Sequence, residues 1–155
     1  MNILIEMIYD SNEKQNICET TLITLPLWFG IPESNAEYAS GVRDIPFYNI
    51  AQNNESIGFV SIRENSKYSF EIYVMGIKPS FHRKGFGELA IRQIENEYRD
   101  KGYKLFEVKT LDESRESEEY RKTREFYNKI GFMKLEVIKE LWGDDNPCLI
   151  MVKSI

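Results

Sequence analysis

A short glycine-containing loop between a strand and a helix constrains this chain more than any other segment. Residues 82–87 read His-Arg-Lys-Gly-Phe-Gly and follow the β-branched and aromatic run of residues 70–77, which has the composition of a strand. Residues 88–98 continue with apolar side chains at helical spacing. The first backbone N–H groups of a helix have no intrahelical partner, and the helix dipole adds partial positive charge there. Because glycine lets an anion approach closely, the loop predicts a phosphate cradle, as in a nucleotide-containing cofactor site.

Three kinds of phosphate-binding loop are compared with this segment. A P-loop requires G-x-x-x-x-G-K-[ST], which no stretch of the chain supplies. Residues 85–90 match the dinucleotide-binding pattern G-x-G-x-x-[GA]. In the dinucleotide-binding fold, however, the first glycine follows the strand closely, whereas here residues 78–84 separate the strand from Gly85. The strands predicted before residue 70 also do not alternate with helices. The third kind is the acyl-CoA loop of the GNAT superfamily of N-acetyltransferases, [QR]-x-x-G-x-[GA], which residues 82–87 resemble with His82 in the first place.

A second motif strengthens the resemblance to the GNAT superfamily. Residues 123–132 resemble the signature in which a helix carries F-Y-x-x-x-G-F into a last pair of strands. Tyr120, Thr123 and Tyr127 share one helical face with Ile130, and Gly131 follows as a helix stop. Residues 25–33 and 141–153 are similar to one group of bacterial GNAT proteins, so the resemblance spans nearly the whole chain.

The resemblance implies acetyl-CoA as cosubstrate. It places the acetyl and pantetheine arm along the main chain at the end of the strand, and the pyrophosphate on the N–H groups of the loop. The cofactor-binding residues that it implies are Met75, Gly76, Ile77, Arg83, Lys84, Gly85, Phe86, Gly87, Glu88 and Thr123. Tyr120 departs from the family, which often has Asn at this place. One histidine and two distant cysteines give no metal-ligand spacing, so no metal is expected.

Two residues are candidates for proton transfer. Tyr127 occupies the family's position for the acid that protonates the departing thiolate; the alternative is an aromatic ring that packs on the sheet. Glu71 stands where a glutamate acts as general base in the histone-acetyltransferase branch, and a carboxylate on a partly buried strand can take a proton through water. The alternatives are a solvated glutamate and a base replaced by a water chain.

Other side chains are candidates for an acceptor pocket or for the loop. Glu33 and Glu107 are further carboxylates that could face an acceptor pocket. The rings of Trp28, Phe29 and Tyr38 suit a cationic acceptor, although packing in a core or lid is an equal alternative for them. We expect His82 to lend its backbone to the loop and not to act as a base.

Composition and pattern predict one α+β domain over residues 1–155. We expect strands at 2–8, 46–51, 56–64, 67–77, 104–111, 132–141 and 147–153, and helical segments at 10–24, 34–43, 88–98 and 117–129. They would form a mixed, mostly antiparallel sheet of about seven strands flanked by helices. The resemblance implies that this is a GNAT-like fold, whose splayed central strands hold the cofactor.

The predicted function is acetyl transfer to a primary amine of a small molecule or peptide. The formal charge of −5 argues against a nucleic-acid partner and favours a cationic acceptor. Without a signal peptide or an apolar membrane span, we expect a cytoplasmic enzyme with no membrane partner; a homodimer stays open. The alternative function is a non-catalytic acyl-CoA-binding or sensing module.

Overall fold

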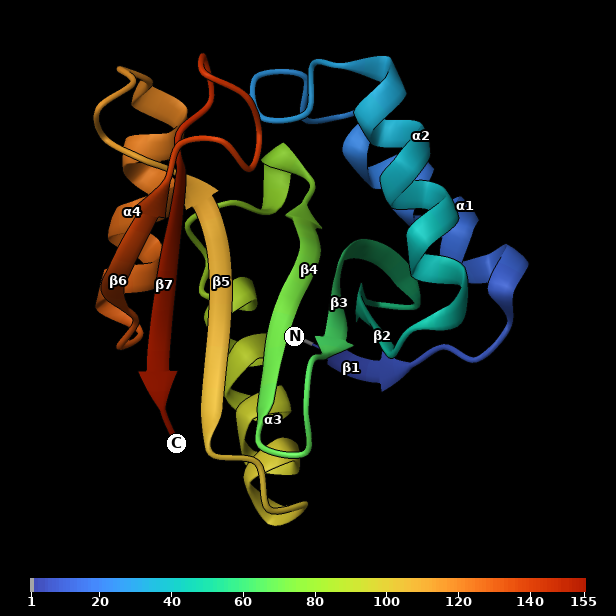
Figure 1. Ribbon diagram of the computed structural model, residues 1–155. Coiled ribbons are helices and arrows are strands. Elements are labelled where there is room, and N and C mark those ends of the chain that lie inside the picture. Colours follow the sequence, from blue (N-terminus) through green and yellow to red (C-terminus); the bar gives the residue numbers. More distant parts are fainter. Residues whose placement is uncertain (1) are drawn as a thin grey trace. The chain divides into compact units, whose positions relative to one another are not determined.

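The computed structural model describes residues 2–155, and its strands form a seven-stranded sheet (Figure 1). The strands are ordered β1-β2-β3-β4-β5-β7-β6. The β4–β5 pair is parallel, whereas β1–β2, β2–β3, β5–β7 and β6–β7 are antiparallel. The predicted α+β class with a mixed, mostly antiparallel sheet is therefore confirmed. The elements are β1 (Ile3–Met7), α1 (Ser11–Leu22), α2 (Pro32–Gly41), β2 (Phe47–Gln52), β3 (Glu55–Glu64), β4 (Ser69–Ile77), α3 (Phe86–Asp100), β5 (Leu105–Leu111), α4 (Glu118–Lys129), β6 (Met133–Ile138) and β7 (Cys148–Ser154).

The chain divides into two compact units, and strand β4 contributes to both. The first unit extends to Arg63 and includes Tyr73–Glu97, whereas the second comprises Glu64–Ile72 and Tyr98–Ile155. The first half of β4 therefore belongs to the second unit, and its second half belongs to the first.

In the first unit, α1 and α2 lie beside each other (Figure 1). Their apolar faces bury a core with the strands, in which the rings of Phe47 and Phe59 stack at 5.0 Å. The hairpin between β2 and β3 turns at Asn53 and Asn54, both with positive φ, as a tight hairpin turn requires. The sequence signal for that turn is confirmed.

In the second unit, β5, β7 and β6 lie side by side, and α4 packs beside them (Figure 1). Ser117 caps α4 by accepting the Tyr120 N–H at 3.3 Å. At the other end, Gly131 adopts φ 109° and the Phe132 N–H donates to the Tyr127 carbonyl at 3.0 Å. This is the glycine stop predicted from the sequence.

Among the predicted boundaries that differ from the structure, three have an identifiable physical reason. Strand β6 ends at Ile138, opposite Cys148, because the next residue of the partner strand is Pro147, which has no N–H to donate. Strand β4 begins only at Ser69, since the Ser66 hydroxyl accepts the N–H of Ser69 at 3.1 Å and holds a turn. Helix α2 begins at Pro32, a residue favoured at the first helical position.

None of the helices within residues 2–155 is both long and apolar enough to cross a bilayer.

Candidate functional site

The predicted cofactor loop follows the end of β4 and is tied back to it. Pro79 opens a short 3-10 turn, and the His82 N–H donates to the Pro79 carbonyl at 3.1 Å. The His82 ring Nε2 lies 2.5 Å from the Ile77 carbonyl oxygen. Because a carbonyl only accepts, Nε2 must carry the proton. His82 therefore fixes the loop through its ring as well as its backbone.

Two left-handed residues shape the loop before helix α3 begins. Arg83 has φ 59° and Gly85 has φ 82°. A Cβ at Gly85 would meet nothing within 4 Å, so conformation rather than space favours glycine here. The first hydrogen bond of helix α3 joins the Leu89 N–H to the Gly85 carbonyl at 3.0 Å. The N–H groups of residues 86–88 precede it and have no partner within the helix, so they are available to an anion.

The charged side chains of the loop lie mostly toward solvent. Arg83 and Lys84 are exposed, and the Lys84 ammonium lies 5.6 Å from the Phe81 ring centre. Glu88 pairs with Arg92 one turn along α3, at 3.6 Å. Two cations thus flank the backbone N–H groups, while the carboxylate is engaged on the helix surface.

The end of β4 is packed closely on both sides within the first unit. A Cβ at Gly76 would lie 3.0 Å from Leu25 of the segment after α1, and a Cβ at Gly58 of β3 would lie 2.6 Å from the Gly76 carbonyl oxygen. The Lys78 N–H donates to the Ile57 carbonyl of β3 at 2.9 Å. The loop of residues 82–88 is therefore attached, through the His82 ring and Ile77, to the closely packed strand end that contains Met75–Ile77.

Tyr127 lies in the second unit and is 6% exposed. Its ring contacts the ring of Phe132 at 5.6 Å and that of Phe126 at 5.4 Å. Burial raises the pKa of the Tyr127 phenol well above its usual value, and the neighbouring Tyr120 hydroxyl acts in the same direction. The phenol therefore keeps its proton at neutral pH. One turn earlier, the Thr123 hydroxyl donates to the Glu119 carbonyl of its own helix at 3.2 Å.

Glu71 is buried in an ion pair and is not a solvated glutamate. Its exposed fraction is 4%. Its Oε2 accepts from the Lys109 ammonium at 2.8 Å, and its Oε1 accepts from the Asn65 amide at 3.2 Å. Lys109 also lies 3.5 Å from Glu107. Burial lowers the pKa of Lys109, but the hydrogen bonds and charges of the two glutamates outweigh it and leave that pKa raised.

The structure places Glu71 and Tyr127 on opposite faces of the sheet in the second unit. Phe70 pairs with Phe106 and Glu71 with Glu107, and consecutive strand residues point to opposite faces. Phe106 contacts Phe132 at 5.1 Å, and Phe132 in turn contacts Tyr127. Tyr127 therefore belongs to the face of Phe106, and the acid and base candidates are not in contact.

The aromatic candidates of the first unit form a packed row. Tyr38 contacts Phe29 at 6.0 Å and Tyr73 at 5.6 Å, and the Arg63 guanidinium lies 4.3 Å from the Tyr73 ring centre. Phe29 and Tyr38 pack against the core of this unit, which supports the packing alternative for them. The Trp28 ring instead meets the His82 ring edge-on at 5.7 Å. Glu33 is exposed in the first turn of α2.

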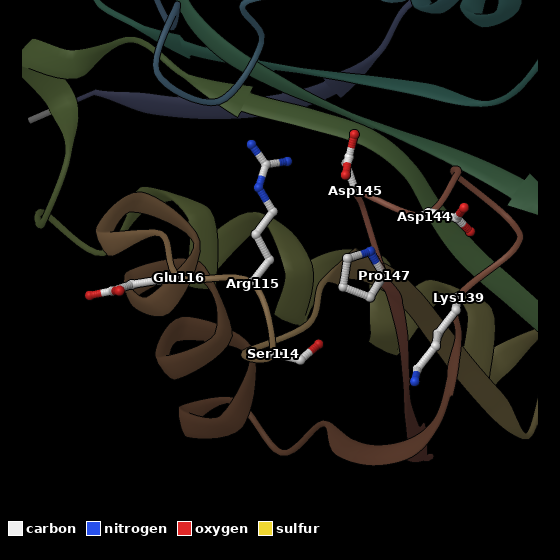
Figure 2. Close-up of a pocket in the computed structure, with 7 residues that line it drawn as sticks. All are labelled: Ser114, Arg115, Glu116, Lys139, Asp144, Asp145 and Pro147. Atoms are coloured by element: carbon white, nitrogen blue, oxygen red, sulfur yellow. The ribbon is translucent and has the colours of Figure 1, made fainter.

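A separate polar pocket of about 720 Å³ opens in the second unit (Figure 2). Arg115 and Asp145 extend to the same side of Pro147, whereas the Lys139 side chain points the other way (Figure 2). Arg115 also hydrogen bonds to Asn146. None of the predicted site residues lines this pocket, whose walls are Ser114, Arg115, Glu116, Lys139, Asp144, Asp145 and Pro147.

Sequence reasoning missed Lys109 and Asn65, which hold Glu71. Their proximity depends on the parallel register of β4 with β5 and on the turn before β4, and no local pattern encodes that register. Across residues 2–155, no cluster of three or more histidine, cysteine, aspartate or glutamate side chains could hold a metal ion.

A model of the acetyltransferase (GNAT) domain matches residues 43–134, more than half of the chain. The chain therefore belongs to the GNAT acetyltransferase family. The comparison with curated proteins found no match.

Solved structures share the fold over almost the whole chain. A GNAT-family structure from Desulfovibrio desulfuricans is 15% identical with a TM-score of 0.83, and 99% of each chain is covered. A GNAT-family acetyltransferase from Elizabethkingia anophelis, with acetyl-CoA bound, is 18% identical with a TM-score of 0.76, again over 99% of each chain. The aminoglycoside 6′-N-acetyltransferase from Enterococcus faecium is 19% identical with a TM-score of 0.74, over 99% of this chain and 97% of that chain. At these identities the likeness shows the fold.

The buried ion pair leads to a stability prediction. Lys109→Met should lower the free energy of unfolding by about 2 kcal/mol, because it leaves the Glu71 carboxylate buried without its cation. Adding Glu71→Gln to that variant should recover about 1 kcal/mol, since the two residues are coupled. Chemical denaturation of the single and double variants measures both changes.

Lys134→Met is the matched control, because Lys134 pairs with Glu113 on the surface and an exposed pair contributes little. Strictly additive effects of Lys109→Met and Glu71→Gln would contradict the coupling.

Proposed function

We propose that the protein transfers an acetyl group from acetyl-CoA to a primary amine of a small molecule or peptide. The observation that carries the proposal is the loop of residues 82–88, which joins β4 to the start of α3 with free backbone N–H groups. Membership of the acetyltransferase family supports the reaction. The acetyl-CoA in the related Elizabethkingia structure supports the cosubstrate, and no metal is part of the proposal.

The loop and the end of β4 would hold the two halves of the cosubstrate. The N–H groups of Gly85 to Glu88 would bind the pyrophosphate at the helix start, and the charges of Arg83 and Lys84 would attract it. The pantetheine arm would hydrogen bond to the main chain of Met75 to Ile77. Thr123 on α4 is proposed as a further contact with the arm.

The proposed reaction is direct attack of the amine on the thioester. The amine nitrogen forms a bond with the carbonyl carbon, a tetrahedral oxyanion develops, and the carbon–sulfur bond then breaks. A backbone N–H of β4 would stabilise the oxyanion. Tyr127 would donate its phenolic proton to the departing thiolate, since the phenol carries that proton at neutral pH.

The proton lost by the amine needs an acceptor, and we propose Glu71, acting through water. Because Glu71 and Tyr127 lie on opposite faces of the sheet, the proton would reach the Glu71 carboxylate through water and not by direct contact with the amine. The ion pair with Lys109 would hold the carboxylate in place. The less buried Glu107 and a chain of solvent molecules are the alternatives.

Gly87→Glu should abolish acetyl-CoA binding. The substitution brings a side chain and a negative charge to the N–H groups proposed to hold the pyrophosphate. Asn96→Glu, an exposed change on the third turn of α3, adds the same charge away from the loop and should bind normally. Isothermal titration calorimetry measures both affinities, and a folded Gly87→Glu variant with the parent affinity would exclude the loop.

Tyr127→Phe should lower kcat by roughly 10²-fold while acetyl-CoA affinity is retained, as expected for loss of general acid catalysis. Phenylalanine keeps the ring and its contacts with Phe132, so the fold should be preserved. The assay is thiol release from acetyl-CoA with pooled amines.

The same assay separates the enzyme from the alternative, a module that binds or senses acyl-CoA without catalysis. Binding of acetyl-CoA with no thiol release for any amine would favour that module. Turnover of Tyr127→Phe at the parent rate would instead make the tyrosine structural.

Glu71→Gln should remove the acidic limb of the pH–rate profile and leave the alkaline limb intact. The acidic limb reports deprotonation of the base or the amine, and the amide introduced by Glu71→Gln cannot accept the proton. Glu107→Gln, two residues from Lys109 on the same strand face, should leave the profile unchanged. The pH dependence of kcat/KM for both variants measures this, and an unchanged profile in Glu71→Gln would assign the proton to solvent.

A further inference from the structure

Ser61 of β3 makes two hydrogen bonds to the main chain of one residue of β4. Its hydroxyl donates to the Val74 carbonyl at 2.8 Å and accepts the Val74 N–H at 3.2 Å. Ser61 is completely buried, and Val74 lies in the core of the first unit. One side chain therefore fixes both polar groups of Val74 away from water.

The direction of these bonds determines the direction of the neighbouring main-chain groups. Along a strand, the N–H and C=O of one residue point to one edge and those of the next residue to the other. The main-chain N–H and C=O of Val74 point toward β3. The carbonyl of Gly76 also points toward β3, because its oxygen would lie 2.6 Å from a Cβ at Gly58. The Lys78 N–H continues this alternation, since it donates to Ile57 of β3. The main-chain groups of Met75 therefore point to the opposite edge of β4.

The carbonyl of Ile77 also follows this alternation, since it accepts from the His82 ring at 2.5 Å and not from β3. Between Val74 and Ile77, Met75 presents its N–H and C=O away from β3. Its direction depends on how firmly Val74 is held, and Val74 is held by a side chain that can rotate or be replaced.

We propose that Ser61 is a positioning residue that sets the main chain of Met75 for the thioester arm, an assignment that rests on the proposed function. Ser61 acts only through Val74. A hydroxyl is required because it both donates and accepts. Alanine would leave two buried polar groups of β4 without their partner, so the strand would shift to satisfy them.

The test compares Ser61→Ala with Ser56→Ala, a matched change on the same strand. The Ser56 hydroxyl donates to Asn49 of β2 at 2.6 Å, on the side away from β4. Ser61→Ala should weaken acetyl-CoA binding about tenfold, as expected for loss of a hydrogen bond. Binding of 3′-phosphoadenosine 5′-diphosphate, the nucleotide half of the cosubstrate without the arm, should stay at the parent value. Ser56→Ala should change neither affinity.

Amide hydrogen exchange of the free protein provides a readout that needs no ligand. In Ser61→Ala the amide of Val74 should exchange about tenfold faster, whereas Ser56→Ala should leave it unchanged. Ser61→Thr retains the donor and acceptor and should restore slow exchange and acetyl-CoA affinity. Ser61→Cys, similar in size with a weak donor, replaces Ser61→Ala if the latter does not fold.

The outcomes separate this inference from the proposed function. Parent affinity for acetyl-CoA in Ser61→Ala, or equal loss of acetyl-CoA and its nucleotide half, would overturn the positioning role. If the parent protein binds no acetyl-CoA, the proposed function fails. Unchanged exchange of the Val74 amide in Ser61→Ala would overturn the role of Ser61 on β4 whatever the ligand.

Discussion

The hydrogen bonding of strand β4 is the constraint on which the rest of the structure depends. Its first half pairs in parallel with β5, from Ser69 opposite Leu105 to Ile72 opposite Val108. Its second half is bonded to β3 through Ser61, and Lys78, the residue that follows the strand, is bonded to Ile57. The carboxylate candidate Glu71 lies on the first half, and the main chain proposed for the cosubstrate lies on the second. A change in the direction of this one strand would therefore displace both.

Much of this arrangement could be predicted because its signals are local. The glycines of the loop, the proline after β4 and the F-Y-x-x-x-G-F helix each act within a few residues, and all appear in the structure where the sequence placed them. The end of β6 was missed because it depends on which residue stands opposite. Pro147 is distant in sequence, and its missing N–H matters only once β7 is aligned with β6.

The candidate site was less accessible to sequence reasoning, because its electrostatics arise from pairing between strands. Glu71 was identified as a strand residue, but its burial and its contact with Lys109 follow from the register of β4 with β5. A buried carboxylate without a cation would be costly, yet neither residue signals the other in the linear sequence. Tyr127 was easier, since helical spacing alone places it on the inner face of α4.

The bond between His82 and Ile77 has a consequence for which residues can close the loop. The ring donates through Nε2–H to a carbonyl, so closing the loop in this way requires a side-chain N–H donor at this position. Gln and Arg, the residues typical of this position in the family, also carry side-chain N–H donors. His82 thus preserves the capacity to close the loop while departing from the motif.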